Sequence, residues 1–228
     1  MKSIVVFSGG LDSTVLLHQL LAAGDTVAAI SVDYGQRHRR ELEHAKAIAG
    51  RLGVDWQLAN LSAICPFIAA SSQTSASIAV PHGHYAEESM KQTVVPNRNM
   101  IMLSVAAGWA ISRRFDRVAY GAHTGDHAIY PDCRPEFARA LGNAIRLADW
   151  HPVDLHCPFI EMMKAEIVKL GASLNVDFSA TWSCYEEGET HCGKCGTCFE
   201  RQEAFSLAGV LDPTVYQDPR PRPAFGSA

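Results

Sequence analysis

The chain has 228 residues, of which 47% are hydrophobic, so it is long and apolar enough for a compact core, and intrinsic disorder is excluded. Twenty Lys and Arg against 24 Asp and Glu leave a formal net charge of −4, which gives no overall attraction for nucleic acid. No stretch approaches 18 consecutive apolar residues and no secretory signal precedes the first glycine turn, so we expect a cytoplasmic protein with no nucleic-acid or membrane partner.

Strand and helix patterns alternate along the first sixty residues. Nearly continuous apolar runs over 3–7 and 26–34 predict parallel strands buried on both faces. Apolar residues at helical spacing over 15–21 predict a helix between them, and an amphipathic helix over 39–53 leads to a third strand over 55–61. This βαβαβ order predicts an α/β fold with an open, doubly wound parallel sheet.

The middle of the chain interrupts this rhythm. Residues 65–95 are rich in Ser and Ala with no clear period, which indicates a long excursion from the core. The helix pattern returns over 97–114, with Asn97 or Asn99 as its cap, and a strand over 116–123 follows.

Helical patterns over 136–149, 162–174 and 198–209 complete the expected elements. We therefore predict a nucleotide-binding α/β domain over 1–175, a zinc-binding helical segment over 176–210 packed on it, and a Pro-rich tail over 211–228 that forms no regular structure.

The stretch SGGLDS (8–13) lies between the first strand and the first helix. Backbone N–H groups at such a turn converge on an anion, and the hydroxyls of Ser8, Ser13 and Thr14 are further donors to phosphate oxygens. Asp12 would repel phosphates unless a divalent cation lies between them, which points to Mg²⁺. The alternative is an ordinary turn in which Asp12 or Ser13 caps the helix.

Four cysteines are crowded near the carboxyl end with the spacing C-x7-C-x2-C-x2-C: Cys184, Cys192, Cys195 and Cys198. Four thiolates at this spacing form a closed tetrahedral shell, which predicts one structural Zn²⁺ per chain. Two disulfides, free buried thiols and an iron–sulfur cluster are the alternatives. His191 is beside this set, but four sulfurs already complete the shell.

These motifs carry two resemblances. SGGLDS after the first strand resembles the loop of the PP-loop ATP pyrophosphatases, whose adenine nucleotide alpha hydrolase-like fold holds the β,γ-pyrophosphate of ATP while AMP passes to a substrate. The chain also resembles the 7-cyano-7-deazaguanine synthase family (QueC) of queuosine biosynthesis. The resemblance lies in the order and spacing of four stretches: FSGGLDST, VPNRNMIMLSVAAGWA, YGAHTGDHAIYPDCRPEF, and TWSCY with CGKCGTC. The resemblance covers roughly positions 3 to 209.

The resemblance implies an ATP-dependent C–N ligase that converts 7-carboxy-7-deazaguanine to a nitrile through adenylated intermediates. Two rounds of adenylation would consume two ATP, with Mg²⁺ as the co-substrate's cation. The chain has no room for a glutaminase domain, so ammonium is the expected nitrogen source. A homodimer is also expected.

Position along the chain assigns candidate roles. The residues expected to bind ATP are Phe7, Ser8, Gly9, Gly10, Leu11, Asp12, Ser13, Thr14, Asp33 and Tyr34. The expected catalytic residues are Asp12 and Asp126, which would share Mg²⁺, and Lys164, which would neutralise charge on the α-phosphate. Arg98, Asp132 and Arg134 are expected to bind the substrate. For each charged residue, a solvated charge or a structural salt bridge is the alternative.

Other polar residues have simpler interpretations. His123 is interpreted as an ordinary hydrogen-bonded histidine rather than a general base, and so is His127. His82 and His84 are interpreted as solvent-facing or lid residues. The arginines of RHRRELEH (37–44) are interpreted as a solvated helix face.

Two other functional classes remain open. A PP-loop enzyme that modifies tRNA, such as a thiolase, would need a basic surface and an exposed catalytic thiol. A non-catalytic nucleotide-binding or zinc-bound interaction module would leave the polar 122–134 loop unexplained. Pyrophosphate release that depends on a deazapurine acid, and not on tRNA, separates the three hypotheses.

Overall fold

The computed structural model describes residues 1–83, 88–186 and 188–218. His84 and the tail beyond residue 218 lie outside the described residues. Among the helices in these ranges, none combines the length and the apolar composition that crossing a bilayer requires.

Within the described residues, five parallel strands form one sheet in the order β3-β2-β1-β4-β5. The strands are β1 (Lys2–Val6), β2 (Thr26–Asp33), β3 (Asp55–Asn60), β4 (Arg117–Ala119) and β5 (Asp154–His156). In the central register, Val5 of β1 is paired with Ala29 of β2 on one side and with Ala119 of β4 on the other. The prediction of an open, doubly wound parallel sheet is confirmed.

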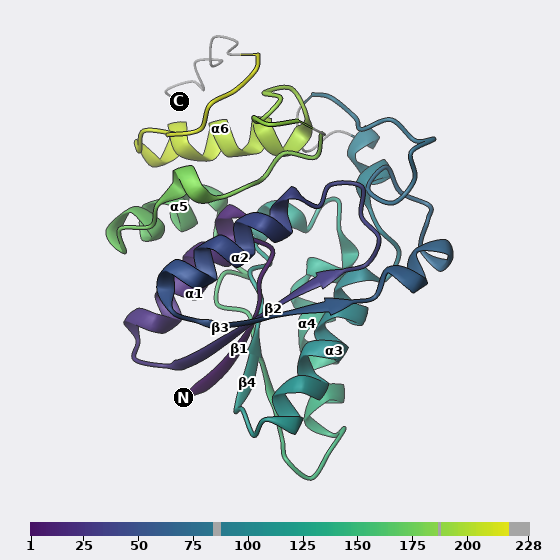
Figure 1. Cartoon of the computed structure of the whole chain (residues 1–228), viewed down its shortest axis with the longest axis vertical. Coiled ribbons are helices and arrows are strands. Elements are labelled where there is room, and N and C mark those ends of the chain that lie inside the picture. The colour runs from purple at the N-terminus through teal and green to yellow at the C-terminus, as the bar shows by residue number, and fades with distance from the viewer. Residues whose placement is uncertain (84–87, 187, 219–228) are drawn as a thin grey trace.

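Helices cover both faces of the sheet. They are α1 (Leu11–Ala22), α2 (Arg40–Leu52), α3 (Arg98–Ser112), α4 (Pro135–Arg146), α5 (Lys164–Ser173) and α6 (Gly196–Ala208). Figure 1 shows α3 and α4 on one face, α1 and α2 on the other, and α6 stacked outside α5. The layers follow from the apolar strands, because a strand buried on both faces needs a helix on each side.

The two-residue period of the strands divides the core in two. Ile4 and Ala28 pack with Leu103 of α3 in one fully buried cluster. The next residues along each strand, Val5 and Ala29, pack in a second cluster on the opposite face, with α1 and α5. Successive side chains of a strand point to opposite faces, so a continuous apolar run supplies both clusters.

Three elements differ from the sequence-based expectation. The strand β5 was not predicted, because its three residues carry no periodic signal. β4 is shorter than the expected 116–123, since residues 120–123 leave the strand and pass the glycine loop, where a Cβ on Gly121 would lie 3.3 Å from the backbone carbon of Asp12. Asn97, one of the two expected caps, occupies the N-cap position of α3, but its side chain makes no capping bond, and the Asp132 carboxylate accepts the Asn99 N–H at 3.0 Å.

The excursion after β3 is anchored by one arginine. The Nη1 of Arg37 donates to the backbone carbonyls of Ser72, Ser75 and Ile78 at 3.4, 3.4 and 3.2 Å. Arg37 is half-buried by these contacts, so its interpretation as part of a solvated face is wrong. A 3₁₀ helix over 62–67 leads into the excursion and another lies within it over 88–93. Ile68 and Val95 of the excursion pack with Val32 near the end of β2.

The carboxyl-terminal segment is also held by a buried arginine. Arg201 of α6 is fully buried and donates to the Phe178 carbonyl at 2.9 Å, the Thr181 hydroxyl at 2.9 Å and the Thr214 hydroxyl at 2.8 Å. Its charge is balanced by Asp212 at 3.6 Å. The segments before and after α6 are thereby fixed to the rest of the molecule.

Candidate active site

The glycine loop between β1 and α1 is wedged against α2. Gly9 has a φ of +75°, and a Cβ on it would lie 2.6 Å from both the backbone oxygen of Glu41 and the backbone nitrogen of Ala45. Only glycine tolerates both the conformation and the contact. The Gly9 carbonyl accepts the backbone N–H of Trp182 at 3.0 Å. The first N–H groups of α1, from Leu11 onward, lack intrahelical acceptors, as an anion-binding helix start requires.

The side chains of the loop support the same geometry. The hydroxyl oxygens of Ser8 and Ser13 lie 3.1 Å apart, and the Gly10 N–H donates to the Ser8 hydroxyl at 3.2 Å. The Thr14 hydroxyl donates to the Gly10 carbonyl at 2.7 Å and is buried beneath the loop. Ser8, Gly10 and Ser13 face the open side, where hydroxyl and N–H donors are able to meet a phosphate.

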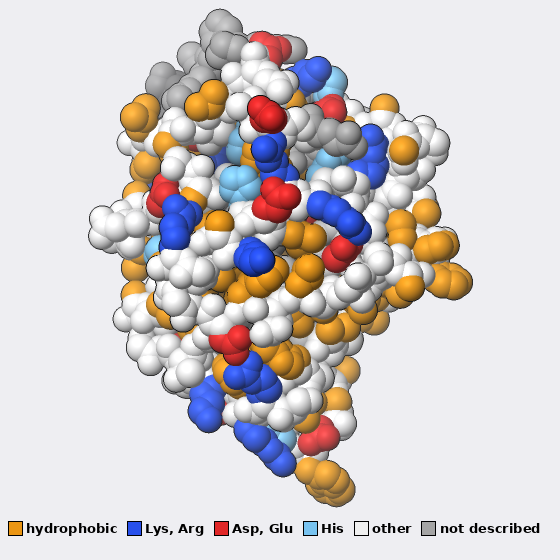
Figure 2. Space-filling model, in the orientation of Figure 1, with side chains coloured by type: hydrophobic (Ala, Val, Ile, Leu, Met, Phe, Trp, Pro, Cys, Tyr) orange, Lys and Arg blue, Asp and Glu red, His pale blue; other side chains and the backbone are white. Residues whose placement is uncertain are grey.

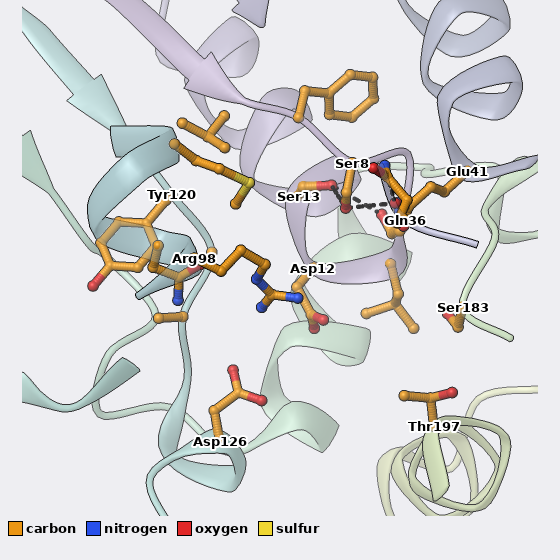
Figure 3. Close-up of a pocket in the computed structure, with 18 of the residues that line it drawn as sticks. Ser8, Asp12, Ser13, Gln36, Glu41, Arg98, Tyr120, Asp126, Ser183 and Thr197 are labelled. Carbon is orange, nitrogen blue, oxygen red and sulfur yellow. Dashed lines mark hydrogen bonds between the residues drawn. The ribbon is translucent and has the colours of Figure 1, made fainter. Parts of the chain in front are cut away.

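A cleft opens at the carboxyl ends of β1, β2 and β4, where the strand order reverses. It holds about 1380 Å³ of space between protein atoms, part of it open to solvent, and it lies where open α/β sheets bind ligands. Among the predicted site residues, those in its wall are Phe7, Ser8, Gly10, Leu11, Asp12, Ser13, Tyr34, Arg98, Asp126, Lys164 and Cys184. In Figure 3 the Arg98 side chain extends toward Asp12, and Asp126 faces both from the opposite wall.

A charged cluster lies beside the loop. The Nζ of Lys164, the first residue of α5, lies 2.7 Å from Glu200 Oε2 and 3.2 Å from Asp12 Oδ2. Burial alone would raise the pKa of Asp12, but Lys164 and His123 outweigh it and hold this pKa below its ordinary value. Burial would lower the pKa of Lys164, yet Asp12 and Glu200 raise it well above its usual range. The lysine is therefore a permanent cation next to the loop.

His123 faces the same cluster. Its Nε2 lies 3.7 Å from Asp126, 3.9 Å from Asp12 and 3.9 Å from Glu200. Its Nδ1 accepts the Gly125 N–H at 3.1 Å, so Nε2 carries the proton and points it at the carboxylates. A nitrogen that carries a proton is not a metal ligand. The interpretation of His123 as a hydrogen-bonded histidine agrees with this geometry.

The carboxylates nevertheless fit a divalent cation. Asp126 and Glu200 offer oxygens within 4.8 Å of each other, and Asp12 Oδ1 is buried with no hydrogen-bond partner in the part of the chain that the structure describes. Mg²⁺ prefers carboxylate and phosphate oxygens, so the donor set suits the ion expected from the sequence.

The cleft wall contains a further carboxylate, that of Glu41. The Gln36 Nε2 donates to Glu41 Oε1 at 3.0 Å, while the Gln36 Oε1 accepts the Tyr34 N–H at 2.9 Å. Burial raises the pKa of Glu41 to about 7, because neither Gln36 nor the more distant Arg98 compensates fully. Burial also raises the pKa of Tyr34 to about 12. Both groups are thus held in their neutral forms more strongly than in water.

Three predicted site residues have partners within the protein fold. Asp33 forms an ion pair with Arg39 at 2.8 Å. Asp132 accepts the backbone N–H of Asn99 and so caps α3, and the Nε of Arg134 donates to the His127 carbonyl at 2.8 Å. These contacts match the structural alternative, and the proposed ligand contacts of the three residues stay predictions.

The four cysteines form a compact, buried set. The Sγ atoms of Cys184 and Cys195 lie 3.9 Å apart, as do those of Cys192 and Cys198. Tetrahedral ligands about 2.3 Å from a single ion lie about 3.8 Å from each other, so the set fits one Zn²⁺. Several backbone N–H groups point at the sulfurs, including that of Cys195 toward Cys192 Sγ at 3.2 Å, which favours thiolates. A four-iron cluster would hold the sulfurs farther apart.

The cysteine set adjoins the cleft. Cys184 is in the cleft wall, and α6, which begins at Gly196 within the set, contributes Thr197 and Glu200. His191 is not needed as a ligand, because its Nε2 accepts the Ser183 N–H at 3.1 Å.

Sequence patterns missed Glu41 and Glu200. Glu41 was included in the supposedly solvated stretch 37–44, and Glu200 follows the last cysteine with no motif of its own. A charged residue among otherwise buried helix positions was the available signal for Glu200, since α6 also buries Cys198, Arg201 and Ala204.

Known proteins resemble this chain in sequence. The chain matches the family described as queuosine biosynthesis protein QueC over residues 2–209. It is 52% identical over 221 residues to the 7-cyano-7-deazaguanine synthase of Rhizobium rhizogenes, covering 96% of this chain and 93% of the relative. It is 50% identical over 214 residues to that of Alteromonas mediterranea, covering 94% and 98%.

Solved structures resemble the fold. The U34-tRNA thiolase NcsA from Methanococcus maripaludis, solved with its 4Fe-4S cluster, gives a TM-score of 0.51 at 16% identity, covering 82% of this chain and 62% of that chain. At this identity the likeness concerns the fold alone.

Proposed function

The chain belongs to the QueC family of queuosine biosynthesis proteins, and from this premise we propose that it converts 7-carboxy-7-deazaguanine and ammonia to 7-cyano-7-deazaguanine at the expense of ATP. One observation carries the proposal: the glycine loop at the start of α1 shares a cleft with a permanently charged lysine, Lys164. That combination suits a reaction in which the loop holds a pyrophosphate leaving group while a cation faces the α-phosphate.

The first step activates the substrate acid. A carboxylate oxygen attacks the α-phosphorus of ATP, the bond from that phosphorus to the bridging oxygen breaks, and pyrophosphate leaves. N–H groups of the 8–13 loop would bind the departing phosphates. Lys164 would stabilise the negative charge that grows on the α-phosphate oxygens. Arg98, which extends into the cleft, would orient the carboxylate.

The nitrogen is introduced in the second step. Ammonia attacks the activated carboxyl carbon, AMP leaves with the transferred oxygen, and the nitrogen loses a proton to give the amide. The amide oxygen then attacks a second ATP in the same way. Loss of AMP and the two remaining N–H protons leaves the carbon–nitrogen triple bond. Each round removes one substrate oxygen as part of AMP, so one cleft serves both rounds.

Two metal ions complete the proposal. Asp12 and Asp126 would hold Mg²⁺, whose chemistry there is to neutralise phosphate charge, while Glu200 beside them stays paired with Lys164. The four cysteines form a buried metal-binding set, and we propose one structural Zn²⁺. Replacing Cys195 with Ser should abolish the one-per-chain metal content and lower the melting temperature, whereas Cys65→Ser, outside the set, should preserve both. Full metal content in Cys195→Ser would contradict the assignment.

The remaining expectations form part of the same proposal. We propose a domain over 1–175, a zinc-binding segment over 176–210 and a tail over 211–228, in a cytoplasmic homodimer. Sedimentation of the metal-loaded protein would test the dimer.

The defining experiment incubates the protein with ATP, ammonium and 7-carboxy-7-deazaguanine and identifies the products by mass spectrometry. Nitrile, AMP and pyrophosphate are expected. Lys164→Met should lower kcat by about 10²- to 10³-fold, and Lys169→Met, an exposed position on the same helix, should leave it unchanged. Formation of ADP, or the absence of nitrile and AMP, would refute the proposal.

The tRNA-modifying alternative is less well supported. Burial raises the pKa of Cys133 in the cleft and that of Cys157 to about 12, which makes both poor nucleophiles. On the face in Figure 2, Lys and Arg side chains are interspersed with Asp and Glu, not gathered in a basic patch. Pyrophosphate release that required tRNA instead of the deazapurine acid would favour that alternative.

A further inference from the structure

Glu200 lies in the cleft wall, and one of its carboxylate oxygens is paired with a lysine. Its side chain is 9% exposed, and Oε2 is 2.7 Å from the Nζ of Lys164. Oε1 lies against the 123–126 turn, where a Cβ on Gly125 would be only 3.0 Å away. His123 Nε2 faces the same oxygen at 3.9 Å. The carboxylate is therefore fixed between a turn on one side and a lysine on the other.

We propose that Glu200 is a positioning residue that holds Lys164 Nζ beside the glycine loop. In this proposal a metal bound by the four-cysteine set fixes Glu200 through the first turns of α6. The proposal rests on the role of Lys164 in the ATP reaction proposed above.

Lys164 needs such a partner because of its own chemistry. A lysine has a flexible four-carbon stem and three N–H donors. Two of these donors point to Asp12 and Glu200, which leaves the third for a phosphate oxygen in the cleft. The lysine side chain is 13% exposed, so its interactions act in a low-dielectric setting. A cation that is already oriented needs no rearrangement when charge develops in the transition state.

The cysteine set controls where Glu200 lies. Cys195 is the N-cap of α6 and Cys198 is in its first turn, two residues before Glu200. A metal bound by all four sulfurs would lock that turn in place, and Glu200 follows as part of the same helix. Arg201 anchors a different face of α6 through Phe178 and Thr181, so changing Glu200 leaves the main anchor intact.

The first test separates positioning from stability. In steady-state assays, Glu200→Gln should lower kcat by about 10- to 100-fold with less than about threefold change in KM for ATP. Glu200→Asp should recover part of the loss. Glu203→Gln, on the same helix outside the cleft, should behave as the parent. A lower melting temperature with unchanged kcat, or a change confined to KM for ATP, would overturn the proposal.

The second test does not depend on activity. Reductive methylation with formaldehyde and borohydride, quantified on peptides by mass spectrometry, should modify Lys164 slowly relative to exposed Lys169. Glu200→Gln and the chelator-stripped protein should each raise the relative Lys164 rate at least about tenfold. If Lys164 is still methylated slowly in Glu200→Gln, the positioning role is overturned. If Lys164 is still methylated slowly in the chelator-stripped protein, the link to the four-cysteine set is overturned. If the parent protein makes no AMP, only the proposed function is refuted. The positioning of Lys164 by Glu200 is still tested, because the methylation rates do not depend on activity.

Discussion

Replacing the cleft carboxylate Glu41 with Gln should stabilise the protein, and more so as the pH rises. Burial raises the pKa of Glu41 to about 7 in the folded chain, from an ordinary value of 4.5. Gln keeps the shape and still accepts a hydrogen bond from Gln36, but it never ionises. The substitution therefore removes only the cost of the buried charge.

The sign and size follow from proton linkage. Because the folded-state pKa is raised, the folded protein retains a proton that the unfolded chain releases, and this advantage is complete below pH 4.5. It is lost as the pH rises to about 7. The full difference corresponds to about 3 kcal/mol. Glu41 borders an open cleft that admits water, so we expect a gain of about 1–3 kcal/mol at pH 8 and less than about 1 kcal/mol at pH 5.

Urea denaturation of the two metal-loaded proteins from pH 5 to pH 8 measures this difference. Glu43→Gln is the matched control, since Glu43 is exposed on the same helix and its replacement should change stability by less than about 0.5 kcal/mol at every pH. A stability difference for Glu41→Gln that stays constant with pH, or a loss of stability at pH 8, would show that Glu41 has a cationic partner and would refute the reasoning.

Two further substitutions test the scaffold. Asp212→Ala should lower the free energy of unfolding by about 3–5 kcal/mol, because it leaves the charge of fully buried Arg201 uncompensated. The control Arg51→Ala breaks an exposed ion pair and should lower the free energy of unfolding by less than about 1 kcal/mol. Equal losses in the two variants would argue against a special role for burial. Gly9→Ala should abolish most ATP-dependent activity, because the added Cβ meets the α2 backbone at 2.6 Å. Gly24 has a similar φ of +79° but open space around it, so the control Gly24→Ala should lower the free energy of unfolding by only about 1 kcal/mol. An active Gly9→Ala protein would contradict the wedged loop.

Much of the fold was predictable because its signals are local. Continuous apolar runs identified the strands β1 and β2, since burial on both faces leaves no polar alternation. The SGGLDS stretch and the cysteine spacing are likewise compact in sequence, so their geometry follows from a few neighbouring residues. The strand β5 escaped prediction because three residues carry no period, and only its pairing with β4 makes it a strand.

The polar residues of the cleft depended on tertiary contacts. Asp132 and Arg134 looked like ligand groups in a loop, yet they cap α3 and brace the loop through Asn99 and His127. A side chain's partner is set by which distant segments pack together, and residue type alone does not specify it.

The sequence by itself determined a parallel α/β sheet, a glycine-rich turn after the first strand and a set of four cysteines that could hold a metal, because each is encoded by residues that are neighbours in the chain. Only the tertiary structure placed Glu200 against Lys164, 36 positions away, and left Glu41 short of a compensating cation. Those features arise where α6 and α2 are packed against the ends of the strands, and packing between remote elements leaves no pattern along the chain.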